Sequence, residues 1–286
     1  MKQFFALSRT THGVLDLAMP GFVALLWLGS FPPFWVIALS LFTAFAAYTA
    51  IYALNDLVGI AVDKEKFTGG INAGYSVEAS DMRYPLAQNV LPYKSGFLWF
   101  AVWFIAALVG AYFLNPFIIA ILVSAALLEV IYVLLFKVTY LRTFVSGLVK
   151  SSGPIAAIYV VDPNPDLSKV FLVLAWVFVW EIGGQNIPAD WNDTVEDKRV
   201  HAKTIPLQLG TQTAGVIVLL TLALTVTFSL LLPRVSPLTL GWPYLAATFL
   251  AGALLLLKPG YDLYRQPVGP EPFTRSEERR VGKECT

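Results

Sequence analysis

Charged residues are scarce in this chain of 286 residues: Asp, Glu, Lys and Arg together make up only 14%. A soluble globular domain carries about 25% charged residues, so this composition excludes an ordinary soluble fold. Hydrophobic residues reach 57%, and most of them must contact lipid or other apolar surfaces. The net charge of +1 identifies no partner by itself, and we expect no nucleic-acid partner.

Histidine and cysteine are almost missing as well, which limits the metal and redox chemistry open to the chain. His12 and His201 stand alone, and neither has the ligand spacing of a zinc site. The one cysteine, Cys285, lies in a terminal string, RSEERRVGKEC, at residues 275–285. That string is either a charged tail or the in-frame translation of a short-read sequencing adapter. We favour the adapter, which makes 275–286 an artefact and leaves residues 1–274 without disulfides.

Apolar runs of membrane-spanning length, by contrast, recur along the chain. A helix needs about 20 mostly apolar residues to cross the hydrocarbon core of a bilayer. A closed β-barrel would show short alternating strands instead of continuous runs. The sequence therefore predicts an all-α, polytopic membrane helical bundle. The eight runs cover residues 14–31, 34–54, 96–114, 116–136, 144–161, 170–187, 214–232 and 240–257.

Basic residues are distributed unevenly over the loops between these runs. One set of loops carries most of the Lys and Arg, whereas the other set has only Lys169 and Arg234. Cytoplasmic loops are enriched in Lys and Arg, so we expect the basic side to face the cytoplasm. The two long polar loops, which follow the second and sixth runs, both lie on that side.

Each of these two loops opens with an acidic motif, NDLVGIAVD at residues 55–63 and DWNDTVED at 190–197. Residues seven apart lie about 20° apart on a helix, so each motif places its aspartates on one face. Close carboxylates repel one another unless they are protonated or share a cation, and oxygen-only ligands favour Mg2+. The candidate metal ligands are Asn55, Asp56, Asp63, Asp190, Asp193 and Asp197.

Basic residues follow both motifs. A single acidic cluster is more often a solvated helix end, but two clusters on one side, each followed by cations, indicate a shared ligand. Metal and cationic side chains together can hold a diphosphate, which carries several negative charges. The candidate diphosphate-binding residues after the motifs are Arg83, Lys198, Arg199 and Lys203.

The pair of motifs resembles the NDxxDxxxD and DxxDxxxD motifs of the UbiA superfamily of intramembrane prenyltransferases. The second motif matches fully, and KTIP at 203–206 also suits the family. RYPL at 83–86 resembles the family's basic RPL element, and Tyr132 with Lys137 resembles a Tyr and Lys that end its fourth helix. The resemblance covers residues 14–257.

The chain departs from the family pattern at three points. Gly59 replaces the central Asp of the first motif, so one expected metal oxygen is missing. The stretch from Asp63 to Arg83 is longer than usual. The family bundle has nine helices, whereas only eight runs precede the polar, Pro- and Gly-containing stretch after residue 257. We expect the ninth helix to have been lost where the adapter-like string begins.

The resemblance implies that Mg2+, held by both motifs, binds the diphosphate of an allylic isoprenoid. It makes Asp63, Asp193 and Asp197 the catalytic residues and adds Lys137 to the diphosphate-binding set. The prenyl group would pass to an aromatic or lipid acceptor, as in quinone or isoprenoid lipid biosynthesis. The expected partners are this donor, a hydrophobic or aromatic acceptor and the bilayer, while the oligomeric state stays open.

A multi-pass transporter is the alternative from a different class. Such a protein would carry its acidic groups near the bilayer midplane, whereas both motifs here follow the ends of apolar runs. Three charges do lie inside runs, at Glu129, Lys150 and Glu181. Each costs roughly 2.5–3.5 kcal/mol to insert, which makes it a candidate functional group. We expect Lys150 to pair with one of the two glutamates.

Overall fold

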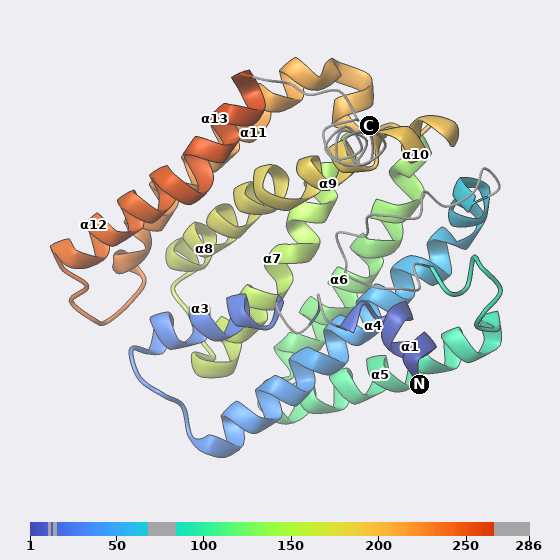
Figure 1. Ribbon diagram of the computed structural model, residues 1–286. Coiled ribbons are helices and arrows are strands. Elements are labelled where there is room, and N and C mark those ends of the chain that lie inside the picture. The colour runs from blue at the N-terminus through green and yellow to red at the C-terminus, as the bar shows by residue number, and fades with distance from the viewer. Residues whose placement is uncertain (11–12, 14–15, 68–83, 266–286) are drawn as a thin grey trace, which may run out of the picture.

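The chain is a bundle of long helices, seen in a computed structural model that describes residues 1–10, 13, 16–67 and 84–265. Helices make up most of the described part, which contains no β-strand (Figure 1). The elements are α1 (Lys2–Leu7), α3 (Ala18–Leu28), α4 (Phe34–Phe67), α5 (Tyr93–Leu114), α6 (Phe117–Leu134), η1 (Leu135–Lys137), α7 (Arg142–Val161), α8 (Leu167–Trp180), η2 (Glu181–Asn186), α9 (Ile187–Asn192), α10 (Thr194–Arg199), α11 (Ile205–Leu231), η3 (Leu232–Arg234), α12 (Trp242–Ala251), η4 (Gly252–Leu257) and α13 (Lys258–Arg265).

Each of the eight apolar runs contains a helix, but among the described residues only seven helical segments are long and apolar enough to cross a membrane. The first run forms only the 11-residue α3. This helix ends at Gly29, whose φ of +71° is the left-handed conformation that favours glycine at a helix end. A Cβ at Gly29 would lie 2.6 Å from Pro237, so the close approach of that loop also requires glycine. The predicted count of eight spans is thus seven full spans and one short helix.

Two of the segments contain a π-helical turn. The sixth run is α8, η2 and α9 in continuous succession, and the last is α12, η4 and α13. The sequence predicted that the last helix would end at 257, which is wrong, because α13 continues through Pro259 to Arg265. A proline lacks the N–H that an α-helix needs, and a wider turn is one way for the helix to accommodate it.

The helices bury small apolar side chains against one another and turn large ones outward. On α5, the exposed residues Leu98, Val102, Ile105 and Val109 follow one another at helical spacing and are 51–64% accessible. This face is apolar and exposed among the described residues, as expected for contact with lipid. The chain is an integral, multi-pass membrane protein by this pattern.

Two apolar clusters fix the segments that carry the acidic motifs. Ile187 and Trp191 of α9 pack with Ile205 and Val218 of α11. On the other side of the bundle, Leu57 of α4 packs with buried apolar residues of α1 and of the segment before α5. Both motifs are therefore held by packed helices rather than by open loops. The terminal string at 275–286 lies outside the described residues.

Candidate active site

The first acidic motif is part of a helix. Asn55, Asp56 and Asp63 all belong to the second half of α4, which continues past the apolar run to Phe67. The sequence predicted that Asp56 and Asp63 share one helical face where the polar loop begins, and α4 continues through the whole motif before that loop. Asp56 and Asp63 are buried, at 2% and 9% accessibility. Buried carboxylates require a cation or hydrogen-bond donors nearby, because an isolated charge in an apolar medium is costly.

The second motif bends at its central aspartate. Asp190 lies in α9 and Asp197 in α10, whereas Asp193 joins the two helices with φ −92° and ψ 8°. The expectation of one continuous helical face is therefore wrong for this motif. The backbone N–H of Asp197 still donates to the carbonyl of Asp193, at 2.8 Å. Asp190 and Asp197 are buried and Asp193 is partly exposed.

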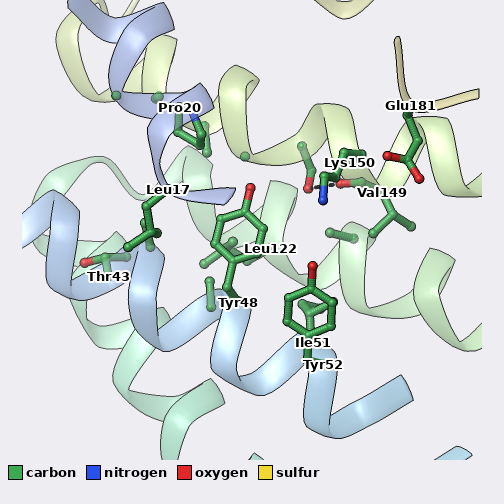
Figure 2. Close-up of a pocket in the computed structure, with 18 of the residues that line it drawn as sticks. Leu17, Pro20, Thr43, Tyr48, Ile51, Tyr52, Leu122, Val149, Lys150 and Glu181 are labelled. Carbon is green, nitrogen blue, oxygen red and sulfur yellow. Dashed lines mark hydrogen bonds between the residues drawn. The ribbon is translucent and has the colours of Figure 1, made fainter. Parts of the chain in front are cut away.

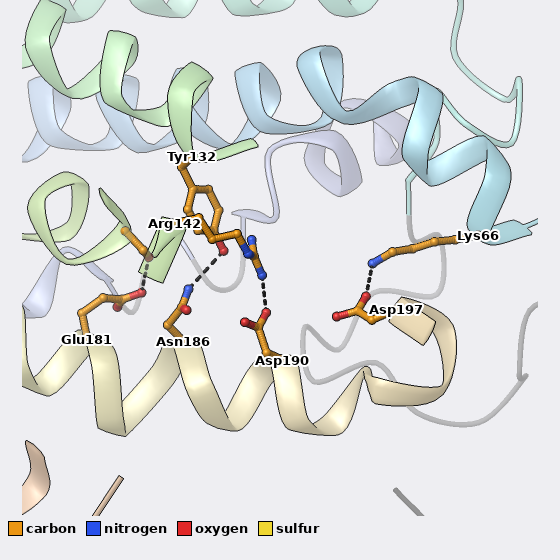
Figure 3. A network of polar contacts seen from close by, with 8 residues as sticks. Lys66, Tyr132, Arg142, Glu181, Asn186, Asp190 and Asp197 are labelled. Atoms are coloured by element: carbon orange, nitrogen blue, oxygen red, sulfur yellow. Dashed lines mark hydrogen bonds and ion pairs between the residues drawn. The ribbon is translucent and has the colours of Figure 1, made fainter. Parts of the chain in front are cut away.

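Three cations that the sequence did not single out contact the motif carboxylates. Lys66 Nζ lies 2.7 Å from Asp197, Arg9 lies 3.0 Å from Asp56, and the Arg142 guanidinium pairs with Asp190. Figure 3 shows the Lys66 and Arg142 pairs side by side along the second motif. Burial raises the pKa of Asp197, and Lys66 opposes that rise. Three of the motif aspartates, Asp56, Asp190 and Asp197, are thus each paired with a cationic side chain.

A sequence signal existed for two of these cations. Lys66 follows Asp63 by three residues, so the two side chains share a helix face. Arg142 is the first residue of α7, at the border of an apolar run, where a buried guanidinium needs a partner. Arg9 gave no such signal, since it approaches α4 from the chain's first segment with a φ of 45°.

The predicted diphosphate-binding residues are placed differently. Lys198 and Arg199 are exposed on α10, and Lys203 is half-buried with its backbone N–H donating to the Phe136 carbonyl at 2.8 Å. Lys137 pairs with Glu65 at 2.5 Å on a partly exposed surface. Arg83 lies outside the described residues. Among the described residues, Lys66, Arg9 and Arg142 therefore contact the motif carboxylates directly. The predicted diphosphate-binding cations in the described part do not.

The motif side chains offer oxygen atoms as possible ligands for a metal. No group of three or more His, Cys, Asp or Glu side chains is close enough to hold a metal among the residues that the structure describes. However, one carboxylate oxygen of Asp190 (Oδ2) and the amide oxygen of Asn186 (Oδ1) are buried without a hydrogen-bond partner there. Buried oxygens without a donor are costly, so a ligand that supplies positive charge would be stabilised at this point. An oxygen-only set of donors suits a hard cation.

A cavity of about 860 Å3 opens beside the motifs and extends through the bundle. Asn55, Asn192 and Asp193 line its polar end, and Phe31 and Ile37 line its apolar end. Asn55 and Ile37 are both on α4, and 18 residues of helix span about 27 Å. The cavity is thus nearly as long as the hydrocarbon core of a bilayer is thick, roughly 30 Å. Figure 2 shows its middle section.

A π-helical turn sets the direction of the polar side chains along the sixth segment. In η2 the backbone bonds run from residue i to i+5, so Glu181 and Asn186 lie on the same face. Asp190 follows Asn186 by one α-helical turn, and all three point toward α6 and α7 (Figure 3). Asn186 donates to the Tyr132 hydroxyl at 3.1 Å and Ser146 donates to Glu181 at 2.7 Å.

Comparison with known families gives the site its context. The model of the UbiA prenyltransferase family matches residues 17–269. This chain belongs to the UbiA prenyltransferase family. It is therefore a membrane prenyltransferase, and the resemblance found in the two acidic motifs is confirmed. A search of curated protein sequences found no match.

Solved structures agree with the family on the fold. A UbiA homologue from Archaeoglobus fulgidus bound to DMAPP and Mg2+ has a TM-score of 0.70 at 14% identity, over 92% of this chain and 95% of that one. A digeranylgeranylglyceryl phosphate synthase has a TM-score of 0.67 at 18% identity, over 94% and 89%. The apo UbiA homologue from Aeropyrum pernix K1 has a TM-score of 0.67 at 18% identity, over 89% and 93%. The UbiA-type helical bundle predicted from sequence is thus confirmed.

Proposed function

We propose that this UbiA-family protein transfers an isoprenoid chain from an allylic prenyl diphosphate to an aromatic or lipid acceptor in a Mg2+-dependent reaction. The observation that carries the proposal is the position of the acidic motifs at the polar end of a membrane-deep, apolar cavity. The Archaeoglobus homologue bound to DMAPP and Mg2+ supports the same donor class for this fold.

The motif residues fit the metal, because they supply only oxygen donors and leave Asp190 Oδ2 without a partner. Asn55, Asp56 and Asp63 from α4 would hold Mg2+ together with Asp190, Asp193 and Asp197 from α9 and α10. When bound, Mg2+ supplies positive charge that stabilises the leaving diphosphate. Among the aspartates, Asp63, Asp193 and Asp197 are the catalytic residues in this proposal.

Cationic side chains of the chain itself complete the diphosphate site. Lys66 and Arg142 pair with Asp197 and Asp190, two of the carboxylates that would hold Mg2+. Both cations would then be available to the phosphate oxygens, since charge-assisted hydrogen bonds to phosphate are strong. Lys137, Lys198, Arg199, Lys203 and Arg83 would add to the positive potential around the site.

The apolar cavity would hold the isoprenoid tail and exclude water from the reacting carbon. As the bond between that carbon and the diphosphate oxygen breaks, the diphosphate leaves with the electron pair. The acceptor then supplies the electrons of the new bond to the prenyl carbon and loses a proton. A dry cavity protects the electron-poor prenyl group from hydrolysis in this step.

The site is proposed to face the cytoplasm, on the basis of the Lys and Arg bias of the loops. Quinone and isoprenoid lipid synthesis are both compatible with the proposed donor. Orientation can be measured in a Cys285→Ser background. Single cysteines introduced at Lys198 and Asn164, on opposite sides of the bundle, are labelled with a membrane-impermeant reagent in intact cells. Labelling of the Lys198 position from outside would contradict the assignment.

A transfer assay tests the function as a whole. The full chain in lipid vesicles, given Mg2+, radiolabelled dimethylallyl diphosphate and a panel of phenolic and lipid-alcohol acceptors, should form a prenylated product. Chelation of Mg2+ should abolish it. Movement of a solute across the vesicle membrane without any prenyl transfer would instead favour the transporter alternative.

Gly59 gives a prediction about the metal requirement. A Cβ at Gly59 would lie 3.3 Å from Asp63 Oδ2 and 3.6 Å from Val133, so a side chain there points at the first motif. Gly59→Asp should lower the Mg2+ concentration for half-maximal activity, because it adds an oxygen ligand beside Asp63. Gly59→Ala, which adds the Cβ alone, is the control. An unchanged or higher requirement in Gly59→Asp would mean that the ligand set is already complete.

A further inference from the structure

A second group of charges lies in the cavity below the acidic motifs, and the proposed diphosphate site does not use it. Lys150 of α7 donates to Asp16 at 2.7 Å, and Tyr52 donates to the same carboxylate at 2.5 Å. The prediction that Lys150 pairs with a glutamate is therefore wrong, because its partner is Asp16. Glu181 lies nearby and accepts from Ser146 at 2.7 Å. We call Asp16, Lys150 and Glu181, with Tyr48, the polar belt.

The polar belt lies well away from the metal ligands. Lys150 follows Arg142 by eight residues of α7, which corresponds to about 12 Å along the helix. Tyr48 precedes Asn55 by seven residues of α4, or about 10 Å. A group held at the polar belt therefore lies deeper in the bundle than the proposed diphosphate site.

Glu181 has an unused hydrogen-bonding atom that borders the cavity. The residue is only 6% accessible, and its Oε2 has no partner among the described residues. It lines the large cavity together with Lys150 and Tyr48. The charge of Lys150 acts on Glu181, but no ion pair joins these two described residues. A buried acceptor without a donor is costly, so a ligand that donates to Glu181 would be stabilised.

Figure 2 shows how these side chains are arranged: Tyr48 stands on α4, and Lys150 and Glu181 come from the opposite wall. Tyr48 stacks beside Tyr52, with ring centroids 6.5 Å apart, and Tyr52 donates to Asp16, so Tyr48 stands next to the Lys150–Asp16 pair. Tyr48 and Lys150 also line a second cavity of about 300 Å3, together with Asp16. A molecule in either cavity can therefore reach them.

The charges of the polar belt restrict what it can bind. With Glu181 ionised, Asp16 and Glu181 outweigh Lys150 by one negative charge; with Glu181 protonated, the three groups are neutral. An anion thus finds no net positive charge among these three groups in either state. A neutral hydroxyl satisfies both partners, because it donates to a carboxylate and accepts from an ammonium group.

We propose that Glu181, Lys150 and Tyr48 bind the prenyl acceptor through an uncharged hydroxyl group and reject acceptors with an anionic group at that position. This inference rests on the proposed transfer function and narrows the acceptor to hydroxyl-bearing, apolar molecules. Asp16 is a positioning residue in it, since it holds Lys150 and contributes the negative charge that disfavours anions.

Hydroquinone and 4-hydroxybenzoate are suitable probes, because they share a phenol ring and differ in one neutral or anionic substituent. Binding of each is measured by calorimetry on the full chain in nanodiscs with Mg2+. Wild type should bind hydroquinone at least about tenfold more tightly, the size of one good hydrogen bond to a charged group. Equal binding, or tighter binding of 4-hydroxybenzoate, overturns the proposal without any variant.

Variants then test the individual residues. Glu181→Gln and Tyr48→Phe should each weaken hydroquinone binding, by about tenfold for the former. The matched control is Ser40→Ala, which removes another cavity-lining oxygen that lacks a partner, at the apolar end, and should leave binding unchanged. The double variant Asp16→Asn with Glu181→Gln makes the belt positive and should reverse the preference toward 4-hydroxybenzoate.

The same preparations are tested for Mg2+-dependent binding of dimethylallyl diphosphate, which separates this inference from the proposed function. Loss of hydroquinone binding with intact diphosphate binding supports the polar belt as the acceptor site. Unchanged hydroquinone binding in both single variants contradicts it and leaves the proposed function standing. Absence of diphosphate binding in wild type would contradict the proposed function itself.

Discussion

Replacement of Asp197 or Asp193 by Ala is expected to reduce prenyl transfer by about a hundredfold or more, the usual effect of removing one group that stabilises developing charge. Asp197 is almost completely buried and holds Lys66, while Asp193 lines the cavity. Both would supply oxygens to Mg2+ in the proposed site. Each variant should also weaken Mg2+-dependent binding of dimethylallyl diphosphate.

Glu196→Gln is the matched control for this experiment. Glu196 lies on α10 between Asp193 and Asp197, and its replacement by Gln removes one negative charge, as each Asp→Ala variant does. Glu196 is not one of the proposed metal ligands, so the turnover of the Glu196→Gln variant should stay near that of wild type. If Asp193→Ala and Asp197→Ala were as active as the control, the proposed mechanism would be wrong.

Arg142→Met is expected to destabilise the folded protein by about 3–5 kcal/mol, because it leaves Asp190 buried without its partner. Both members of this pair are buried, at 4% and 7% accessibility. Arg142 also stacks over the rings of Tyr132 and Phe136, at 4.6 Å from each centroid. Unfolding in detergent, followed by circular dichroism, measures the change.

Two further variants sharpen this second prediction. Glu65→Gln breaks the partly exposed pair with Lys137 and should cost about 1 kcal/mol or less, as surface ion pairs do. Adding Asp190→Asn to Arg142→Met removes the unpaired charge and should recover part of the lost stability. The account would be contradicted if Arg142→Met were as stable as Glu65→Gln. It would also be contradicted if the double variant, Arg142→Met with Asp190→Asn, were less stable than Arg142→Met alone.

The helices of the bundle could be predicted from sequence because apolar length is a local property. Each predicted run contains a helix in the described part of the chain, and the two acidic motifs identified the family. The close approach of Gly29, at the end of α3, to Pro237 could not be foreseen, since the two residues are over two hundred positions apart. The bend at Asp193 was missed for a similar reason, because helical spacing assumes an unbroken helix.

The cations of the site were harder to predict than its carboxylates. The acidic residues form motifs in the sequence, whereas Arg9, Lys66 and Arg142 come from separate segments that meet only in the fold. The pairing of Lys150 with Asp16 joins residues 134 positions apart. Charges within an apolar run signal that partners exist, but only the packing of α3, α4 and α7 determines which ones.

Equilibrium binding of dimethylallyl diphosphate to the full chain, measured with and without Mg2+, tests the central claim most directly. We expect saturable binding with Mg2+ that is lost on chelation and restored when the metal is added back. The double variant Asp63→Asn with Asp197→Asn, which takes one carboxylate from each motif, should not bind under any of these conditions. Binding that is indifferent to Mg2+, or undiminished in that double variant, would contradict a diphosphate site shared by the two motifs.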